Sequence, residues 1–201
     1  MKKFFASLLA LGLSLSLNAN ANAISIDLIA DKTTANIGDN IELQVRISGL
    51  EGASALGSYD VNVHYDSDLF SISNIIWGDT VQGNQLDLFG FGSLQDNSSN
   101  LGWLTMLEVS FDEIADLELL QAGEFTLFSL FLNAVASGSG NFSLTTNAIG
   151  DAYGQDLFID TINSTSINVS AATVSEPAGM LLLLGALAFV VLRNRASQPK
   201  Q

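Results

Sequence analysis

A strict alternation of apolar and polar residues is the feature that most limits what this chain can fold into. Between Asn40 and Ser48 every second residue is apolar, and the same pattern returns between Ser58 and Asp66. A period of two places the apolar side chains on one face of a β-strand, whereas an amphipathic helix needs a period near 3.6. Each segment therefore predicts a strand with one buried face and one solvent-facing face.

Further segments predict more strands and few helices. Residues 101–111 and 125–135 are apolar at both odd and even positions, which is typical of a strand covered on both sides. Shorter strands are predicted at 24–30, 70–77, 142–146, 157–159 and 166–169. Turn residues separate the strands at 37–40, 49–52, 137–140 and 150–154. Many short strands with frequent turns predict an all-β sandwich.

Two segments do not follow the strand pattern. The acidic stretch at 111–120 is expected to form one or two helical turns. Residues 78–100 are rich in Gly, Asn, Asp and Ser, so we expect a long exposed loop there. The Ser- and Thr-rich residues 164–174 predict a flexible tether, although 166–169 within it also alternates as a short strand. The folded domain is thus expected to span residues 24–163.

The N-terminal residues predict export. Two lysines precede an uncharged apolar run over residues 4–17, and the small residues Ala21 and Ala23 follow it. A basic start, an apolar stretch and an Ala-x-Ala site are typical of a secretory signal peptide. We therefore expect residues 1–23 to be removed during secretion, and the alternative of an uncleaved anchor fits the short run less well.

The C-terminal residues have three parts. The motif Ser175-Glu176-Pro177 precedes an uncharged stretch at 178–192, and Arg193 and Arg195 follow. Proline is tolerated at a helix start, an apolar run in lipid can satisfy its backbone only as a helix, and arginines prefer the cytoplasmic side. As a helix the stretch would be roughly 22 Å long, shorter than the ~30 Å hydrocarbon core. We therefore expect a short transmembrane helix that holds the chain transiently, with a permanent anchor or a buried core helix as alternatives.

This tripartite tail resembles the PEP-CTERM sorting signal, which an exosortase recognises in the bacterial inner membrane. The family usually has Pro-Glu-Pro where this chain reads Ser175-Glu176-Pro177, so the Glu-Pro pair is retained. The resemblance implies that an exosortase-type enzyme processes the tail at 175–197. The protein would then reach the cell surface or the extracellular matrix of a bacterium.

Composition limits the partners of the central domain. All acidic residues of the chain except Glu176 lie within residues 24–163, where Lys32 and Arg46 are the only basic residues. Such an excess of negative charge argues against nucleic acid or anionic lipid as a partner. The chain also has no cysteine, which excludes disulfides, a thiol nucleophile and thiolate metal sites.

The order and spacing of the segments resemble the cohesin domain over almost the whole central part. Residues 35–45 are similar to its opening strand pair, and 59–66 with Leu69 are similar to the strand that ends in Tyr-Asp before a turn. Residues 123–140 are similar to its penultimate strands, and 147–156 to its closing Asp-x-x-Gly turn. The resemblance implies a cohesin-like jelly-roll β-sandwich. Some carbohydrate-binding modules share that fold, so it leaves the function open.

Catalysis is not indicated by the residues present. His64 is the only histidine, and it lies on the polar face of its predicted strand, whereas a catalytic triad needs an oriented, buried base. The carboxylate pairs Asp66/Asp68 and Asp112/Glu113 lie in turn-like segments, and nothing places them across a cleft. We expect neither an enzyme nor a cofactor. Calcium at the 150–156 turn or at Asp66/Asp68 is an alternative to a plain turn.

Two binding functions remain, adhesion or recognition of a protein and binding of a carbohydrate. The cohesin resemblance implies a partner-binding sheet face that includes the strand 58–66, with Asp60 at the position of a partner-contacting acid. Asp60, Asn62 and His64 point to the same side of that strand, as the period of two requires. An ordinary solvated face is the alternative interpretation. Carbohydrate binding would instead need exposed aromatic rings, for which Trp77, Phe89 and Phe91 are the candidates.

Overall fold

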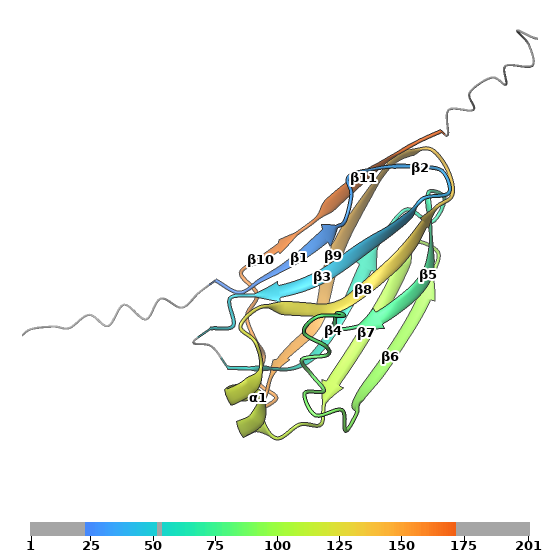
Figure 1. Ribbon diagram of the computed structural model, residues 1–201. Coiled ribbons are helices and arrows are strands. Elements are labelled where there is room, and N and C mark those ends of the chain that lie inside the picture. Colours follow the sequence, from blue (N-terminus) through green and yellow to red (C-terminus); the bar gives the residue numbers. More distant parts are fainter. Residues whose placement is uncertain (1–22, 52–53, 172–201) are drawn as a thin grey trace, which may run out of the picture.

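The computed structural model describes residues 23–51 and 54–171 (Figure 1). The predicted sorting motif, the predicted helix at 178–192 and most of the predicted signal peptide lie outside these residues. In the part of the chain that is described, no helix is both long and apolar enough to cross a membrane.

Two sheets pack face to face. The first sheet contains, in spatial order, β10 (Thr161–Asn163), β1 (Ser25–Ala30), β3 (Asn40–Ser48), β8 (Phe125–Ala134) and β5 (Phe70–Trp77). The second sheet contains β2 (Thr34–Asn36), β11 (Thr165–Ser170), β9 (Gly138–Asp151), β4 (Leu56–His64), β7 (Trp103–Ser110) and β6 (Ser93–Asn100). One helix, α1 (Ile114–Leu120), lies between β7 and β8 at one end of the sandwich (Figure 1). The predicted all-β sandwich and the short helical segment are confirmed.

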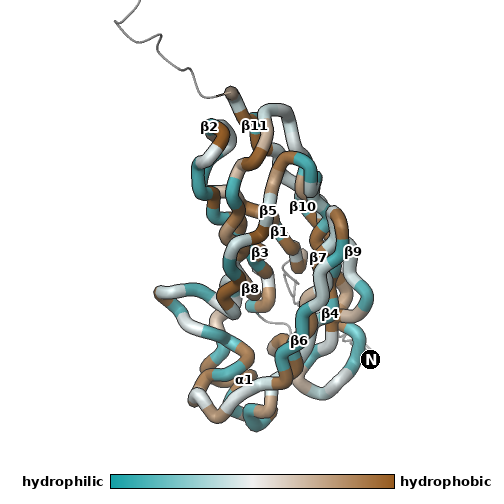
Figure 2. The backbone as a smooth tube through the Cα atoms, turned by 90° about the vertical axis from the view of Figure 1, so that its right-hand side faces the viewer, coloured by the Kyte–Doolittle hydropathy of each residue, from teal (hydrophilic) through white to brown (hydrophobic). Residues whose placement is uncertain are grey.

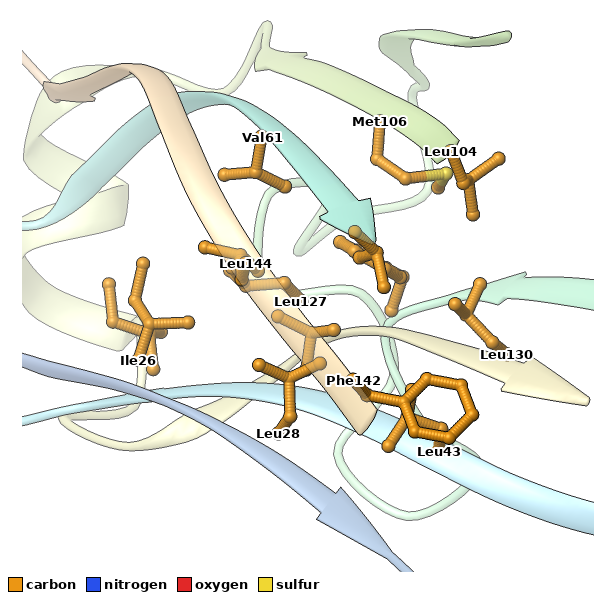
Figure 3. Close-up of a cluster of buried hydrophobic side chains, with 14 of the residues drawn as sticks. Ile26, Leu28, Leu43, Val61, Leu104, Met106, Leu127, Leu130, Phe142 and Leu144 are labelled. Carbon is orange, nitrogen blue, oxygen red and sulfur yellow. The ribbon is translucent and has the colours of Figure 1, made fainter. Parts of the chain in front are cut away.

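The core lies between the two sheets and follows the alternation in the sequence. The apolar residues of β3 and β4 are buried, while their alternate residues face outward. Figure 3 shows part of this cluster. Leu43 and Leu130 belong to the first sheet, and Val61 and Leu104 belong to the second. Full burial of one such side chain stabilises the fold by roughly 1.5–3 kcal/mol. The alternation therefore determines which face of each strand becomes the core.

The prediction of strands covered on both sides is correct for one segment and wrong for the other. Every residue of β8 from Phe125 to Leu130 is buried. In β7, by contrast, Leu104 and Met106 are buried, whereas Trp103 is 45% exposed. The reason is that Trp103 pairs with His64 and points, like it, to the outer face of the second sheet.

The long exposed loop expected at 78–100 is also wrong in part. Residues Ser93–Asn100 form β6, which pairs with β7 along its whole length. Leu86 is only 1% exposed and belongs to the core cluster. Polar residues occupy both faces of β6, so the strand carries no apolar alternation that sequence analysis could detect. Its hydrogen-bonding partners in the tertiary structure decide its conformation.

Three further expectations near the C-terminal end of the domain need correction. Residues 157–159 are not a strand, and the strand that follows them is β10. Residues 138–140 of the turn expected at 137–140 instead belong to β9. Gly140 lies against the ring of Phe70, and a Cβ atom there would come 2.3 Å from it, so the position has no room for a side chain. The predicted tether at 164–174 contains β11, in which Ile167 and Val169 are buried between the sheets. The sandwich therefore extends to Ser170.

Candidate functional site

The outer face of the second sheet carries the predicted binding residues. Across β4 and β7, His64 pairs with Trp103, Asn62 with Thr105, and Asp60 with Leu107. Residues paired in an antiparallel ladder project to the same side of the sheet. The three residues predicted on β4 therefore lie beside side chains of β7 on one continuous surface.

A β-bulge adds one more side chain to this surface. In the pairing of β4 with β9, Asp60 lies opposite Ala148 and Val61 opposite Thr146, so that Asn147 is the extra residue. Bulges redirect side chains and are over-represented beside functional sites. Here the bulge brings the amide of Asn147 within reach of both Asp60 and Asn62.

Asn62 is the centre of the resulting hydrogen-bond network, although it is only 4% exposed. Its Oδ1 accepts hydrogen bonds from Trp103 Nε1 at 3.0 Å and from Thr105 Oγ1 at 2.8 Å. Its Nδ2 donates to Asn147 Oδ1 at 3.0 Å, and Asn147 Nδ2 donates to Asp60 Oδ1 at 2.9 Å. We call these five residues the Asn62 network. Asn62 itself holds the exposed members of the network in place.

Trp103 is also fixed from a second side. The His64 ring lies 4.8 Å from the Trp103 ring, centroid to centroid, in an edge-on arrangement, and His64 Nε2 lies 3.1 Å from Thr145 Oγ1. Trp103 was not among the predicted site residues, because its segment, 101–111, is apolar at both odd and even positions and predicted a strand covered on both sides. The pairing of Trp103 with His64 and the bond to Asn62 place it on the same outer face as the predicted binding residues.

The residues proposed for carbohydrate contact do not form one surface. Trp77 packs against the core, and its ring centroid lies 6.5 Å from that of Tyr59. Phe89 and Phe91 are exposed, with ring centroids 6.0 Å apart. Because the Trp77 ring is used in core packing, the three residues do not build a row of exposed rings.

The carboxylates considered for calcium are used in turns. Asp66 Oδ1 accepts a hydrogen bond from the backbone N–H of Asp68 at 2.9 Å. Asp151 Oδ1 accepts the N–H groups of Tyr153 and Gln155, at 2.9 and 2.8 Å. Among the described residues, no group of three or more His, Cys, Asp or Glu side chains is placed to hold a metal ion.

A buried carboxylate lies on the inner side of the same sheet. Glu108 of β7 is fully buried, and its Oε1 accepts hydrogen bonds from Asn84 Nδ2, Ser93 Oγ and Gln95 Nε2 at 2.5, 2.5 and 2.8 Å. Its Oε2 accepts the hydroxyl of Tyr59 at 3.0 Å. Burial, reinforced by the adjacent carboxylate, raises the pKa of Tyr59 well above its ordinary value, so the hydroxyl keeps the proton that it donates.

The charge of the binding face is negative. Its acidic residues are Asp60 on β4 and Asp96 on β6, which pair in register with Leu107 from opposite sides. Lys32 and Arg46 are the only Lys or Arg side chains in the described residues. Lys32 pairs with Asp31 at 3.4 Å, and Arg46 of the first sheet pairs with Glu124 at 2.6 Å. A partner with basic groups would therefore meet no competing cation on this face.

Several solved protein structures have a fold similar to that of this chain. The chain is similar to a non-cellulosomal cohesin from the archaeon Archaeoglobus fulgidus, with 16% identity and a TM-score of 0.55 over 75% of this chain and 94% of that chain. It is similar to a type II cohesin domain from the cellulosome of Acetivibrio cellulolyticus, with 14% identity and a TM-score of 0.59 over 73% and 95%. A cohesin–dockerin complex from Clostridium thermocellum matches with 15% identity and a TM-score of 0.57 over 74% and 100%.

Sequence comparison leads to the same family. No curated protein sequence matches this chain. The sequence model of the cohesin domain matches residues 26–169, which is most of the chain and nearly the whole sandwich. The strands that hold the Asn62 network all lie within that match. This chain therefore belongs to the cohesin domain family.

Proposed function

We propose that this chain is an exported, non-catalytic recognition module that binds a protein partner through the outer face of β9, β4, β7 and β6. The family membership supports this assignment, and the relative from Clostridium thermocellum was solved as a cohesin–dockerin complex. A dockerin-like module is therefore the partner class that we propose. Its binding would serve adhesion or assembly at the cell surface.

The observation that carries the proposal is the Asn62 network. It holds an indole, a hydroxyl and a carboxylate in fixed positions on the surface of the sheet before any partner binds. Side chains that are ordered in advance lose little conformational entropy on association, so more of the contact energy appears as affinity. Tryptophan is also among the residues that most often dominate binding energy at protein interfaces.

Capture of a partner by the mature domain, from the cell envelope or matrix of its own organism, tests this proposal. Asp60→Ala and His64→Ala together should reduce capture at least tenfold, because they remove a charge and a support of Trp103. Glu42→Ala, on the outer face of the first sheet, is the matched control and should leave capture unchanged. Equal capture by the double variant and the unchanged protein would refute the proposed face.

Delivery to the surface is a separate part of the proposal and is supported by sequence alone. We propose that residues 1–23 direct export and that an exosortase-type enzyme acts at Ser175-Glu176-Pro177. The stretch 178–192 with Arg193 and Arg195 would hold the chain in the inner membrane only until then. Mass spectrometry of the surface protein should find no residues beyond about Pro177. An intact Gln201 would instead indicate a permanent anchor.

The alternative, a carbohydrate-binding module associated with extracellular polysaccharide, gains little from the structure. Trp77 is packed against the core, which leaves Phe89 and Phe91 as the exposed rings among the three candidates. Retention on polysaccharide columns that is lost with Phe89→Ala and Phe91→Ala would favour this alternative. Retention should be absent if the outer face of the second sheet recognises protein only.

A further inference from the structure

The four outermost strands of the two sheets differ in how well their edges are protected. Proteins usually protect sheet edges by keeping the edge strand short or by interrupting it with a bulge, a lysine or a proline. Among the described strands, β10 and β2 are three residues long, and β5 has a register shift between Ile72 and Asn74. At that shift, Ser73 Oγ donates a hydrogen bond to the carbonyl of Phe131 at 2.9 Å. Three of the four edges are thus short or interrupted.

The fourth edge, β6, has none of these features. It is eight residues long, it pairs with β7 without a register shift, and it contains neither Lys nor Pro. Figure 2 shows that this strand is hydrophilic along most of its length, so its exposed side chains favour contact with water although its edge is unpaired. In the described part of the chain, no strand pairs with the other side of β6. Its outward backbone N–H and C=O groups can therefore accept another strand.

Residues of β5 in the first sheet and of β6 in the second line a cleft of about 300 Å³ beside this edge. Figure 1 shows the places of these two strands. Phe70, Ile72, Ile75 and Leu104 form its apolar part, and Asn97 lies at the β6 side. Phe70 and Leu104 are buried, whereas Ile72 and Ile75 are only half-buried. The sandwich is therefore not fully filled at this side, and an added strand could place side chains between the sheets.

We propose that the β6 edge binds an extended segment of a partner protein, which adds a further strand to the second sheet. This mode uses main-chain hydrogen bonds for affinity and alternate side-chain pockets for specificity. It goes beyond the proposed function, because it uses the edge of the sheet instead of its outer face. The edge and the outer face are different surfaces of the sheet, so a single partner could use one or both.

The two faces of β6 indicate the chemistry of that segment. Ser93 and Gln95 bond to the buried Glu108, so these odd-numbered residues point inward, toward the core and the cleft. Asp96 pairs with Leu107 and shares the outer face with Asp60. A fitting strand therefore has aliphatic residues at its inward positions and basic residues at its outward positions. A second copy of β6 fits less well, because it would bring polar residues to the apolar cleft.

The edge is held in place before a partner arrives. Ser93 Oγ and Gln95 Nε2 donate to Glu108 at 2.5 and 2.8 Å, which fixes the first half of β6 to the core. The second half, from Asn97 to Asn100, borders the cleft and leads into the turn before β7. An ordered edge reduces the conformational entropy lost when a strand is added.

A synthetic seven-residue peptide that alternates valine with lysine tests the proposal against the full chain. Two further peptides carry N-methyl groups on either the odd or the even backbone amides. Strand addition predicts that one methylated peptide binds at least tenfold more weakly, whereas the other keeps the affinity of the parent, because alternate amides face β6. A scrambled peptide of the same composition controls for attraction to the acidic surface. Hydrogen exchange should show new protection at alternate amides of β6.

Two protein variants test the cleft. Asn97→Trp places an indole at the cleft and should weaken binding of the parent peptide at least tenfold. Ser98→Trp, the next residue on the outer side, is the matched control and should leave the affinity within about twofold. Thermal unfolding of both variants confirms that each is folded. Asp60 lies on β4, two strands away from the β6 edge, so Asp60→Ala should weaken peptide binding by no more than about twofold, which separates this site from the proposed outer-face function.

Several results would overturn the proposal. These are the absence of binding by the parent peptide at millimolar concentration, equal binding of the two methylated peptides, and equal binding by the Asn97→Trp and Ser98→Trp variants. A concentration-dependent dimer that Asn97→Trp dissociates would identify a second copy as the occupant and would also overturn it. Partner capture that depends on Asp60 would persist in all these cases.

Discussion

The outer faces of the two sheets carry similar polar residues in different arrangements. On the first sheet the contacts are separate pairs, such as Arg46 with Glu124 at 2.6 Å and Gln44 with Glu42 at 3.0 Å. On the second sheet one buried amide, Asn62, links side chains of β4, β7 and β9 into a single network. Isolated exposed pairs contribute little to stability, whereas a network around a buried group orders a surface. The difference is the reason why we propose the second sheet, and not the first, as the recognition face.

A substitution on the inner side of the second sheet should lower the stability of the fold the most. Glu108→Gln keeps one acceptor oxygen but adds N–H donors opposite the donors of Asn84, Ser93 and Gln95. Donors left without an acceptor in a buried position should lower the free energy of unfolding by about 3 kcal/mol. Urea denaturation measures this loss. Glu42→Gln on the first sheet is the control and should change stability by less than about 0.5 kcal/mol.

A substitution at the centre of the Asn62 network should cause the second-largest loss of stability. Asn62→Ala removes the acceptor for Trp103 and Thr105 and the donor to Asn147, so stability should fall by about 2 kcal/mol. Tryptophan fluorescence should shift as Trp103 loses its fixed position. Gln44→Ala removes a side-chain bond of the first sheet and should change stability much less. Similar losses in the two variants would show that the two faces do not differ in this way.

Trp103→Ala should separate stability from recognition. Because the ring is 45% exposed, its removal should cost less stability than Asn62→Ala. Partner capture should nevertheless fall at least tenfold, which corresponds to about 1.4 kcal/mol or more of binding free energy. Capture by the Trp103→Ala variant at the level of the unchanged protein would show that the indole is not a contact residue.

Removal of the ion pair of the first sheet should cause the smallest loss of stability. Arg46 and Glu124 are about 38% and 50% exposed, so solvent and salt screen their attraction. Arg46→Ala should therefore lower the free energy of unfolding by no more than about 0.5 kcal/mol. A larger loss in urea denaturation would mean that the first face is more strongly coupled than its separate contacts indicate.

Much of the fold could be predicted, because its central strands carry their own pattern. The apolar period of two located β3 with the bounds that the structure shows, and it placed Asp60, Asn62 and His64 on one side of β4. The shorter strand predicted at 70–77 has the bounds of β5. The same reasoning failed for β6, where polar residues on both faces give no period. The short alternation at 166–169 did locate β11, whereas the Ser- and Thr-rich composition wrongly suggested a tether over the same residues.

The candidate site could be predicted only in part, because its members come from separate strands. Asn147 joins it through a bulge in β9, and a bulge has no signature in this sequence. Trp103 joins it through pairing with His64, although its own segment looked apolar on both faces. The burial of Glu108 could not be predicted, because nothing near it in the sequence differs from an acid on an exposed strand face. Its hydrogen-bond donors come from other segments, namely Tyr59, Asn84, Ser93 and Gln95.

The sequence by itself determined the central strands, the face of each of them that enters the core, and the excess of negative charge, because local alternation and composition depend on neighbours along the chain. Only the tertiary structure decided the pairing of β6, the burial of Glu108 and Asn62, and the position of Trp103. These features depend on hydrogen bonds and packing between residues far apart in the chain, and such contacts produce no periodic pattern in the local sequence.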